Sequence, residues 1–127
     1  MPALTTAEAN RLLDASFGTA TYTAPTTPMK LALVTVTGSA SAAGTEVTGG
    51  SYARQTLAMT SASAGSTPNT SLITFSAMPA STVTGVDVFD SNGTPRRCWW
   101  GNLTASKVLG SGDSISFSAS AIAATLG

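Results

Sequence analysis

The side chains that could do acid–base or nucleophilic chemistry are few in this 127-residue chain, and their spacing does not suggest a catalytic group. There is no histidine, which excludes a histidine-based triad or a histidine metal ligand. Asp87 and Asp90 lie three apart in a predicted strand, where alternation places them on opposite faces. A glycosidase needs two carboxyl groups that face one cleft, and Glu46 with Asp113 is the remaining distant pair. We therefore predict no catalytic residues and no enzymatic activity.

Cofactor, metal, nucleic-acid and membrane sites are also not indicated. The glycines of Thr48–Ser51 lack the lysine and the following helix of a phosphate-binding loop. Cys98 is the only cysteine, so no intramolecular disulfide can form. The formal net charge is zero, which leaves nothing to neutralise a run of phosphates, and no apolar run approaches the roughly 18 residues of a membrane span. We expect no cofactor, no metal, no nucleic-acid partner and no membrane partner.

The most conspicuous cluster is Arg96–Gly101, which contains both tryptophans and two of the six basic residues. In a strand, alternation turns one of Trp99 and Trp100 inward and the other outward. The simplest interpretation is that one packs in the core and the other covers the sheet. A second interpretation is that one tryptophan and Arg96 or Arg97 anchor a protein interface, where such side chains are enriched. A sugar-stacking platform is a third.

One amphipathic helix is predicted over residues 5–17. Thr5 followed by Glu8 forms a capping box at its start, and Gly18 ends it. An apolar stripe at helical spacing consists of Ala9, Leu12, Leu13 and Phe17. This stripe requires a cover, which is either the rest of the domain or a neighbouring subunit. The first unit, residues 1–18, is thus a helix packed on the domain or extending from it.

The rest of the chain, residues 19–127, reads as a single β-sandwich domain. An extended arm over 19–28 precedes the first strand, and Ser91–Thr94 predicts a hairpin with a two-residue type I′ turn at Asn-Gly. The predicted strands are 29–37, 51–60, 72–77, 83–90, 96–103, 114–119 and 121–127. Residues 38–50 read as a small, flexible segment and residues 61–68 as a loop. The fold class is mainly β, an antiparallel sandwich or jelly-roll-like domain with one N-terminal helix.

The composition favours association. Only 9% of the residues are charged, the mean hydropathy is +0.23, and Thr, Ser and Ala make up nearly half of the chain. A core built from small side chains leaves little margin over chain entropy, and a neutral surface does not keep copies apart. We therefore expect a protein whose surface is largely covered by other subunits in an assembly. The alternative is a low-charge monomer that its hydroxyl groups keep soluble.

The segment Gly44–Gln55 (GTEVTGGSYARQ) resembles a motif of a family of short tailed-bacteriophage structural proteins. This family includes small tail-fibre, minor tail and auxiliary head proteins. The helix start at Leu4, the strand Asn69–Phe75 and the turn Ser111–Asp113 are similar as well, whereas residues 35–43 are shorter and Arg96–Cys98 departs from the pattern. The resemblance implies a virion component, without catalysis, that is present in repeated copies and binds other phage proteins.

Within that family, we expect a capsid decoration protein that binds the outer head surface in many copies. The head is favoured over the tail because a short domain cannot form a long fibre alone. The partners of the protein would be the major capsid protein and copies of itself, as a trimer by analogy. The alternative is a small tail or tail-fibre-associated protein involved in host adsorption, where an exposed tryptophan could contact a glycan. A sugar-binding module outside any virion is a third hypothesis. The start of the chain has no secretory signal pattern, so assembly in the bacterial cytoplasm into virions is expected.

The predicted interface residues lie in the N-terminus, the arm, the family motif and the tryptophan cluster. Arg54 is expected to pair with Glu46 or Asp87, because an isolated buried arginine is costly. The predicted set is Pro2, Leu4, Thr5, Tyr22, Pro25, Glu46, Tyr52, Arg54, Arg96, Arg97, Trp99 and Trp100.

Overall fold

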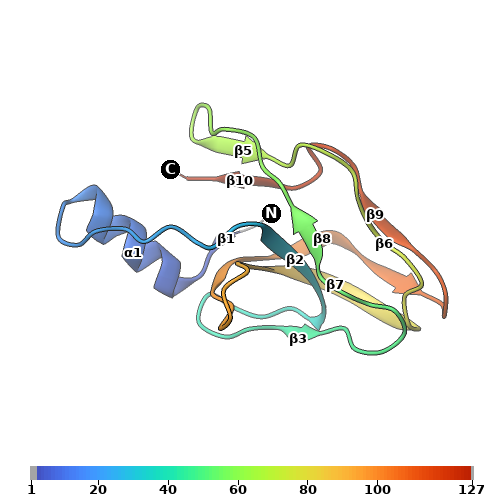
Figure 1. The fold of residues 1–127 in the computed structure, drawn as a ribbon. Coiled ribbons are helices and arrows are strands. Elements are labelled where there is room, and N and C mark those ends of the chain that lie inside the picture. The colour runs from blue at the N-terminus through green and yellow to red at the C-terminus, as the bar shows by residue number, and fades with distance from the viewer. Residues whose placement is uncertain (1–2, 127) are drawn as a thin grey trace.

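A computed structural model describes residues 3–126, and Figure 1 shows their arrangement. The protein is mainly β with antiparallel strands and one N-terminal helix, which confirms the predicted fold class. The helix is α1 (Thr6–Ser16). The strands are β1 (Ala3–Leu4), β2 (Met29–Val36), β3 (Thr45–Glu46), β4 (Gln55–Leu57), β5 (Ser66–Pro68), β6 (Ile73–Phe75), β7 (Ser81–Phe89), β8 (Arg97–Leu109), β9 (Ile115–Phe117) and β10 (Ala123–Thr125).

The main sheet has six strands in the order β1-β8-β7-β2-β3, and β4 pairs with the same edge of β2 as β3 does. β2 is central because Leu31–Val34 is a continuous apolar run, and all four of its residues are fully buried. Such a run is typical of a strand that is covered on both faces. β7 pairs with β2 on one side and with β8 on the other, so these three strands form the frame of the molecule.

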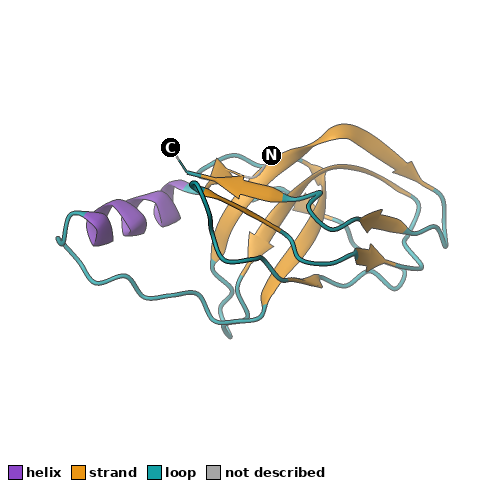
Figure 2. Cartoon of the chain, turned by 90° about the horizontal axis from the view of Figure 1, so that it is seen from above, coloured by secondary structure: helices purple, strands orange, loops and turns teal. Residues whose placement is uncertain are grey.

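Two small sheets, β5–β10 and β6–β9, form a second layer over one face of the main sheet (Figure 2). The core lies between the layers, where Leu33 and Val86 of the main sheet belong to one buried cluster with Phe75 of β6. Phe75 stacks on Tyr52 at 6.0 Å between ring centres and meets Phe117 edge-on at 6.3 Å. A few aromatic and aliphatic side chains therefore hold the two layers together.

Several strand boundaries differ from the prediction. Within the predicted strand 51–60, only β4 and an isolated bridge from Met59 to Asn69 form, so the segment pairs with two different partners instead of continuing one ladder. Two short strands were not predicted: β3 lies in the segment 38–50, predicted to be flexible, and β5 in the segment 61–68, predicted to be a loop. β8 extends beyond the predicted 96–103, because it pairs with β7 again after a bulge that the sequence pattern did not reveal.

The β7–β8 hairpin is confirmed, but its predicted two-residue turn is wrong. Residues 90–96 form a longer connection closed by the carboxylate of Asp90, which is 4% exposed. The Asp90 oxygens accept hydrogen bonds from the backbone N–H groups of Arg96 at 2.7 Å, Asn92 at 3.2 Å and Thr26 at 3.1 Å. Gly93 does not take a positive φ, so a buried carboxylate replaces the glycine geometry of a type I′ turn.

Candidate functional site

α1 and the following arm, residues 17–28, project from one end of the sandwich (Figures 1 and 2). We call α1 and this arm the projection. The base of α1 is anchored to β8: the Thr5 hydroxyl donates to the Arg97 carbonyl at 3.0 Å, and the Thr5 N–H donates to the Cys98 carbonyl at 3.0 Å. Thr5 also caps the helix by accepting from the Glu8 N–H, which confirms the predicted helix start. One buried threonine therefore both starts the helix and joins it to the sheet.

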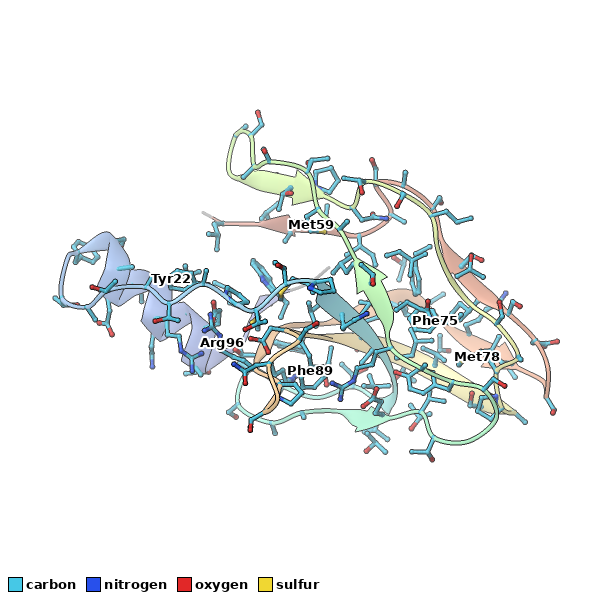
Figure 3. The ribbon with its side chains drawn as sticks, viewed as in Figure 1. Tyr22, Met59, Phe75, Met78, Phe89 and Arg96 are labelled. Atoms are coloured by element: carbon cyan, nitrogen blue, oxygen red, sulfur yellow. The ribbon has the colours of Figure 1, made fainter. Side chains whose placement is uncertain are left out.

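The side of α1 that faces the body is organised around Glu8, which is only 2% exposed. One Glu8 oxygen accepts from Arg11 Nη1 at 3.1 Å, and the other accepts from Arg96 Nη2 at 3.0 Å and from the Tyr22 hydroxyl. Arg96 also donates to the Thr23 carbonyl at 2.9 Å. This Glu8 network therefore joins helix, arm and hairpin loop, and Figure 3 shows Tyr22 and Arg96 at that junction.

The Glu8 network alters the acidity of Tyr22. Burial and the hydrogen bond to the Glu8 carboxylate together raise the pKa of Tyr22 to about 12. The phenol is thus held in its neutral, hydrogen-bonded form at any ordinary pH. An acid–base catalyst works best with a pKa near the operating pH, and the pKa of Tyr22 is far above it. The buried phenol therefore positions the arm and is not suited to proton transfer.

The outer face of the main sheet, which is the face away from the second layer, carries a second ion pair. Asp87 is 1% exposed and receives the Arg97 guanidinium, with Nε at 2.9 Å and Nη2 at 2.8 Å from Oδ1. Its other oxygen accepts from the Gly44 N–H at 3.0 Å, and Arg97 also donates to the Ser39 carbonyl at 2.8 Å. This pair fastens the loop 38–44 over the sheet.

Three polar side chains of the segment Gly44–Gln55 come together in one cluster. Glu46 accepts from the Tyr52 hydroxyl at 2.7 Å and from two nitrogens of Arg54, each at 2.9 Å. This confirms the predicted pairing of Arg54, whose guanidinium also lies 3.9 Å from the centre of the Phe89 ring. Burial would raise the pKa of Glu46, but the hydrogen bonds from Arg54 and Tyr52 hold it below its usual value. These three side chains therefore stabilise the edge of the sheet at β3.

The two tryptophans point to opposite faces, as predicted, and both are only partly exposed. Trp99 pairs with Val88 and packs against the core, where it lines a small apolar hollow of about 90 Å³ under β10. Trp100 lies opposite Asp87 on the outer face, and its indole N–H is buried without a hydrogen-bond partner. Both rings are half-buried. Neither ring of this pair is fully exposed, and an adhesive role for one of them stays a prediction.

The apolar stripe of α1 is not covered by the described part of the domain. Ala9 and Leu12 are half-buried, whereas Leu13 is 56% and Phe17 80% exposed. With Leu4 of β1, the stripe borders an open hollow of about 480 Å³ lined by Leu4, Ala9, Leu12, Leu13, Ser16 and Leu126. Of the two covers that the sequence left open, the described part of the domain covers only part of the stripe and leaves Leu13 and Phe17 exposed, because the Glu8 network holds the other side of α1 against the body.

A second hollow, of about 570 Å³, lies between the start of α1 and the loop 38–44 and is lined in part by Arg11, Arg96 and Arg97. These arginines already pair with Glu8 and Asp87, so the hollow has little free positive charge. Among residues 3–126, no cluster of three or more metal-ligating side chains occurs. Nor does any helix of this part of the chain have the length and apolar character needed to cross a bilayer.

The predicted interface residues therefore divide by location. Pro2 lies outside the described residues. Leu4 borders the stripe, and Thr5, Tyr22 and Arg96 anchor the projection, while Pro25 is half-buried in the arm. The remaining predicted residues, Glu46, Tyr52, Arg54, Arg97, Trp99 and Trp100, belong to the sandwich. Nothing local in the sequence indicates that Glu8 and Asp87 are buried carboxylates, because Arg96 lies 88 residues from Glu8 and Arg97 lies on the strand next to Asp87.

Comparison with known families gives one match. The family model described as podophage GP4 fiber I protein gp80 matches residues 3–125. No match was found among the curated proteins. The matched range contains α1, the arm and every strand of the structure, so the similarity covers the projection and the sandwich together.

Proposed function

The chain belongs to the podophage GP4 fiber I gp80 family, and from this membership we propose that it is a non-enzymatic subunit of the phage fibre apparatus. It is thus a bacteriophage structural protein. The observation that carries the proposal is the extent of the match, which covers residues 3–125 of the 127 residues.

The family supports the tail-fibre alternative better than the capsid decoration that we first expected. Its description names a fibre protein, and a fibre subunit binds other virion proteins through surfaces rather than through a catalytic cleft. As a fibre subunit, the chain would be incorporated into virions during assembly in the host cell. Its partners would be copies of itself and neighbouring proteins of the tail.

The use of charge in the structure supports a structural role. All four arginines pair with carboxylates: Arg11 and Arg96 with Glu8, Arg54 with Glu46, and Arg97 with Asp87. Asp90 accepts three backbone N–H groups. The charges of these residues thus hold the loops and the projection in place. Contacts with other proteins would then be made by the large exposed hydrophobic side chains.

The location of the protein in the virion tests the proposal. Antibodies against the purified protein, labelled with gold, should bind at the tail of intact virions in electron micrographs. Quantitative mass spectrometry should find the protein in tail fractions and not in heads separated from tails. Many copies on tail-less heads would overturn the fibre assignment and restore the capsid decoration hypothesis.

The part of the proposal that concerns host adsorption needs its own measurement. Virions assembled without the protein should adsorb to host cells more slowly, and added purified protein should restore adsorption only if it is present during assembly. Normal adsorption by virions that lack the protein would restrict its role to holding the fibre together.

A further inference from the structure

We propose that Asn92 is a site of spontaneous covalent modification, at which the peptide nitrogen of Gly93 displaces the side-chain amide of Asn92 and leaves an aspartyl or isoaspartyl residue. The change loosens the loop between β7 and β8 and, through it, the attachment of the projection. The proposal goes beyond the assignment to the fibre apparatus and does not depend on it.

The tip of the loop 90–96 is exposed, although the two ends of the loop are held together. The Asp90 N–H donates to the Arg96 carbonyl at 3.0 Å, and the Asp90 carboxylate accepts from the Arg96 N–H at 2.7 Å. Residues 91–95 between these ends are all exposed. In the described part of the chain, the Gly93 N–H has no hydrogen-bond partner. The nitrogen that would act as nucleophile is therefore accessible and is not held by another contact.

The side chain of Asn92 is folded back along the loop. Its oxygen Oδ1 accepts from the Thr94 N–H at 3.1 Å, as in an Asx turn. This hydrogen bond closes a small ring of atoms that contains both Cγ of Asn92 and the nitrogen of Gly93. The Thr94 N–H also faces the oxygen that becomes negative when the nitrogen adds to Cγ, and a donor held in this position stabilises such a charge.

Neither the conformation nor the packing of the loop requires glycine at position 93. The φ of Gly93 is not positive, and a Cβ atom added there would meet no atom within 4 Å apart from its chain neighbours. Glycine does supply a flexible backbone and a peptide nitrogen that no side chain shields. Gly93 is thus dispensable for the fold, but it leaves Asn92 open to attack.

The other three asparagines of the chain lack this combination. Asn69 is 1% exposed, and its amide both donates and accepts hydrogen bonds inside the domain. Asn10 lies within α1, where the helical backbone is fixed. Asn102 is exposed but lies in β8 and precedes the bulky Leu103. Asn102 is therefore a control within the same chain.

The reaction requires only water and hydroxide. Hydroxide removes the proton of the Gly93 N–H, and the nitrogen forms a bond to Cγ of Asn92. The bond from Cγ to Nδ2 then breaks, and Nδ2 takes a proton from water and leaves as ammonia, which regenerates the hydroxide. Water opens the cyclic imide at the side-chain carbonyl to give aspartate, or at the main-chain carbonyl to give isoaspartate. Nothing is oxidised or reduced, and the chain gains one negative charge.

The modified residue would disturb the loop at its anchor. The Asn92 N–H donates at 3.2 Å to Oδ1 of Asp90, the same oxygen that accepts from the Arg96 N–H. Isoaspartate lengthens the backbone at this point, and either product places a new carboxylate beside that of Asp90. The side chain of Arg96 in turn holds Glu8 and the arm. Displacement of the loop is therefore passed to the projection.

Ageing of the purified full chain tests the site. After days in warm, mildly alkaline buffer made with heavy-oxygen water, peptide mass spectrometry should find the heavy oxygen at residue 92 well before it appears at Asn102. An isoaspartyl methyltransferase should methylate the aged chain.

Gly93→Ala is the matched variant, because the structure has room for the added methyl group. It should fold as wild type by circular dichroism and lose the Asn92 amide about tenfold more slowly. The proposal would be overturned if residue 92 lost its amide no faster than Asn102, or if Gly93→Ala were modified at the wild-type rate.

Limited proteolysis tests the consequence for the projection. The arm 17–28 should be cut faster in the aged wild-type chain than in the fresh one, whereas aged Gly93→Ala should be cut at the rate of its fresh form. Unchanged cutting of wild-type chains in which residue 92 has been converted would overturn the link to the projection. Equal acceleration in the aged wild type and in aged Gly93→Ala would contradict it as well, since the cause would then lie elsewhere in the chain.

Discussion

β2 and α1 use their apolar residues in opposite ways. In β2, Leu31–Val34 is fully buried between neighbouring structures on both faces. In α1, the residue buried against the body is Glu8, whereas Leu13 and Phe17 are exposed. The sandwich is therefore held by apolar burial, while the projection is positioned by hydrogen bonds and ion pairs. A helix oriented by polar contacts can keep its apolar side free for another chain.

The two modes of stabilisation fail in different ways. Burial of a large apolar side chain contributes about 1.5–3 kcal/mol and is spread over many contacts. A buried ion pair contributes little net stability, yet removing one partner costs about 3–5 kcal/mol because the other charge stays buried. The projection thus depends on a few specific atoms around Glu8, whereas the sandwich depends on the sum of its core.

The same substitution in the two regions should give the largest contrast. Phe75→Ala removes a ring that is 1% exposed and contacts two other aromatic rings, so the free energy of unfolding should fall by about 3–5 kcal/mol. Phe17→Ala removes a ring that is 80% exposed and should change this free energy by less than about 0.5 kcal/mol. Urea unfolding of the monomer at low concentration measures both. Equal losses for the two variants would show that α1 packs on the domain in solution.

Removal of the Glu8 carboxylate should have the next largest effect, and a local one. Glu8→Ala leaves the Arg96 guanidinium and the Tyr22 hydroxyl without their acceptor, so detachment of the projection should become easier by about 3 kcal/mol. Limited proteolysis should then cut the arm 17–28 much faster, while the unfolding midpoint of the sheet changes little. Asp14→Ala, which removes an exposed acid from the same helix, is the matched control.

This contrast also explains which features the sequence could reveal. The apolar run of β2 and the Thr5 cap of α1 are local patterns, and both are confirmed. The orientation of α1 was not predictable, because an apolar stripe is normally assumed to face the core, and nothing local indicates that Glu8 pairs with Arg96, 88 residues later. The Asp90 loop was mispredicted because the buried Asp90 carboxylate, which accepts from Asn92 and Arg96 within the loop and from Thr26 in the arm, outweighs the local Asn-Gly preference.

Within the candidate site, short separations were again easier to predict. Arg54 and Glu46 lie eight residues apart, and their pairing was expected from the cost of burying an arginine. The buried partner of Arg97 is Asp87, on the neighbouring strand, and only the observed register of β7 and β8 brings the two together. Whether the stripe faced its own domain could be learned only from the three-dimensional placement of α1.

Loss of the Tyr52 hydroxyl should destabilise the sandwich by a smaller amount. The hydroxyl donates to Glu46 and accepts from the Leu33 N–H at 3.0 Å, so Tyr52→Phe leaves a backbone donor and a carboxylate less well satisfied. The free energy of unfolding should fall by about 1–3 kcal/mol, because buried polar groups lose their partner while the ring remains in place. Chemical unfolding measures this loss, and an unchanged unfolding midpoint would mean that water replaces the hydroxyl.

The smallest effect should be a dependence of the projection on alkaline pH. The fold favours the neutral Tyr22 phenol and raises its pKa from 10.0 to about 12, whereas Tyr22 in a detached arm ionises near the ordinary value. The stabilisation of the docked arm is therefore complete below pH 10 and is lost as the pH rises towards about 12. Proteolysis of the arm should accelerate in this window, and Tyr22→Phe should make its rate less sensitive to pH there.

Because the pKa of Tyr52 is also raised by burial and by its bond to Glu46, Tyr52→Phe controls for loosening of the sandwich. An arm that stays protected to the same degree from pH 10 to 12 would show that the Arg96–Glu8 pair holds it without the phenol.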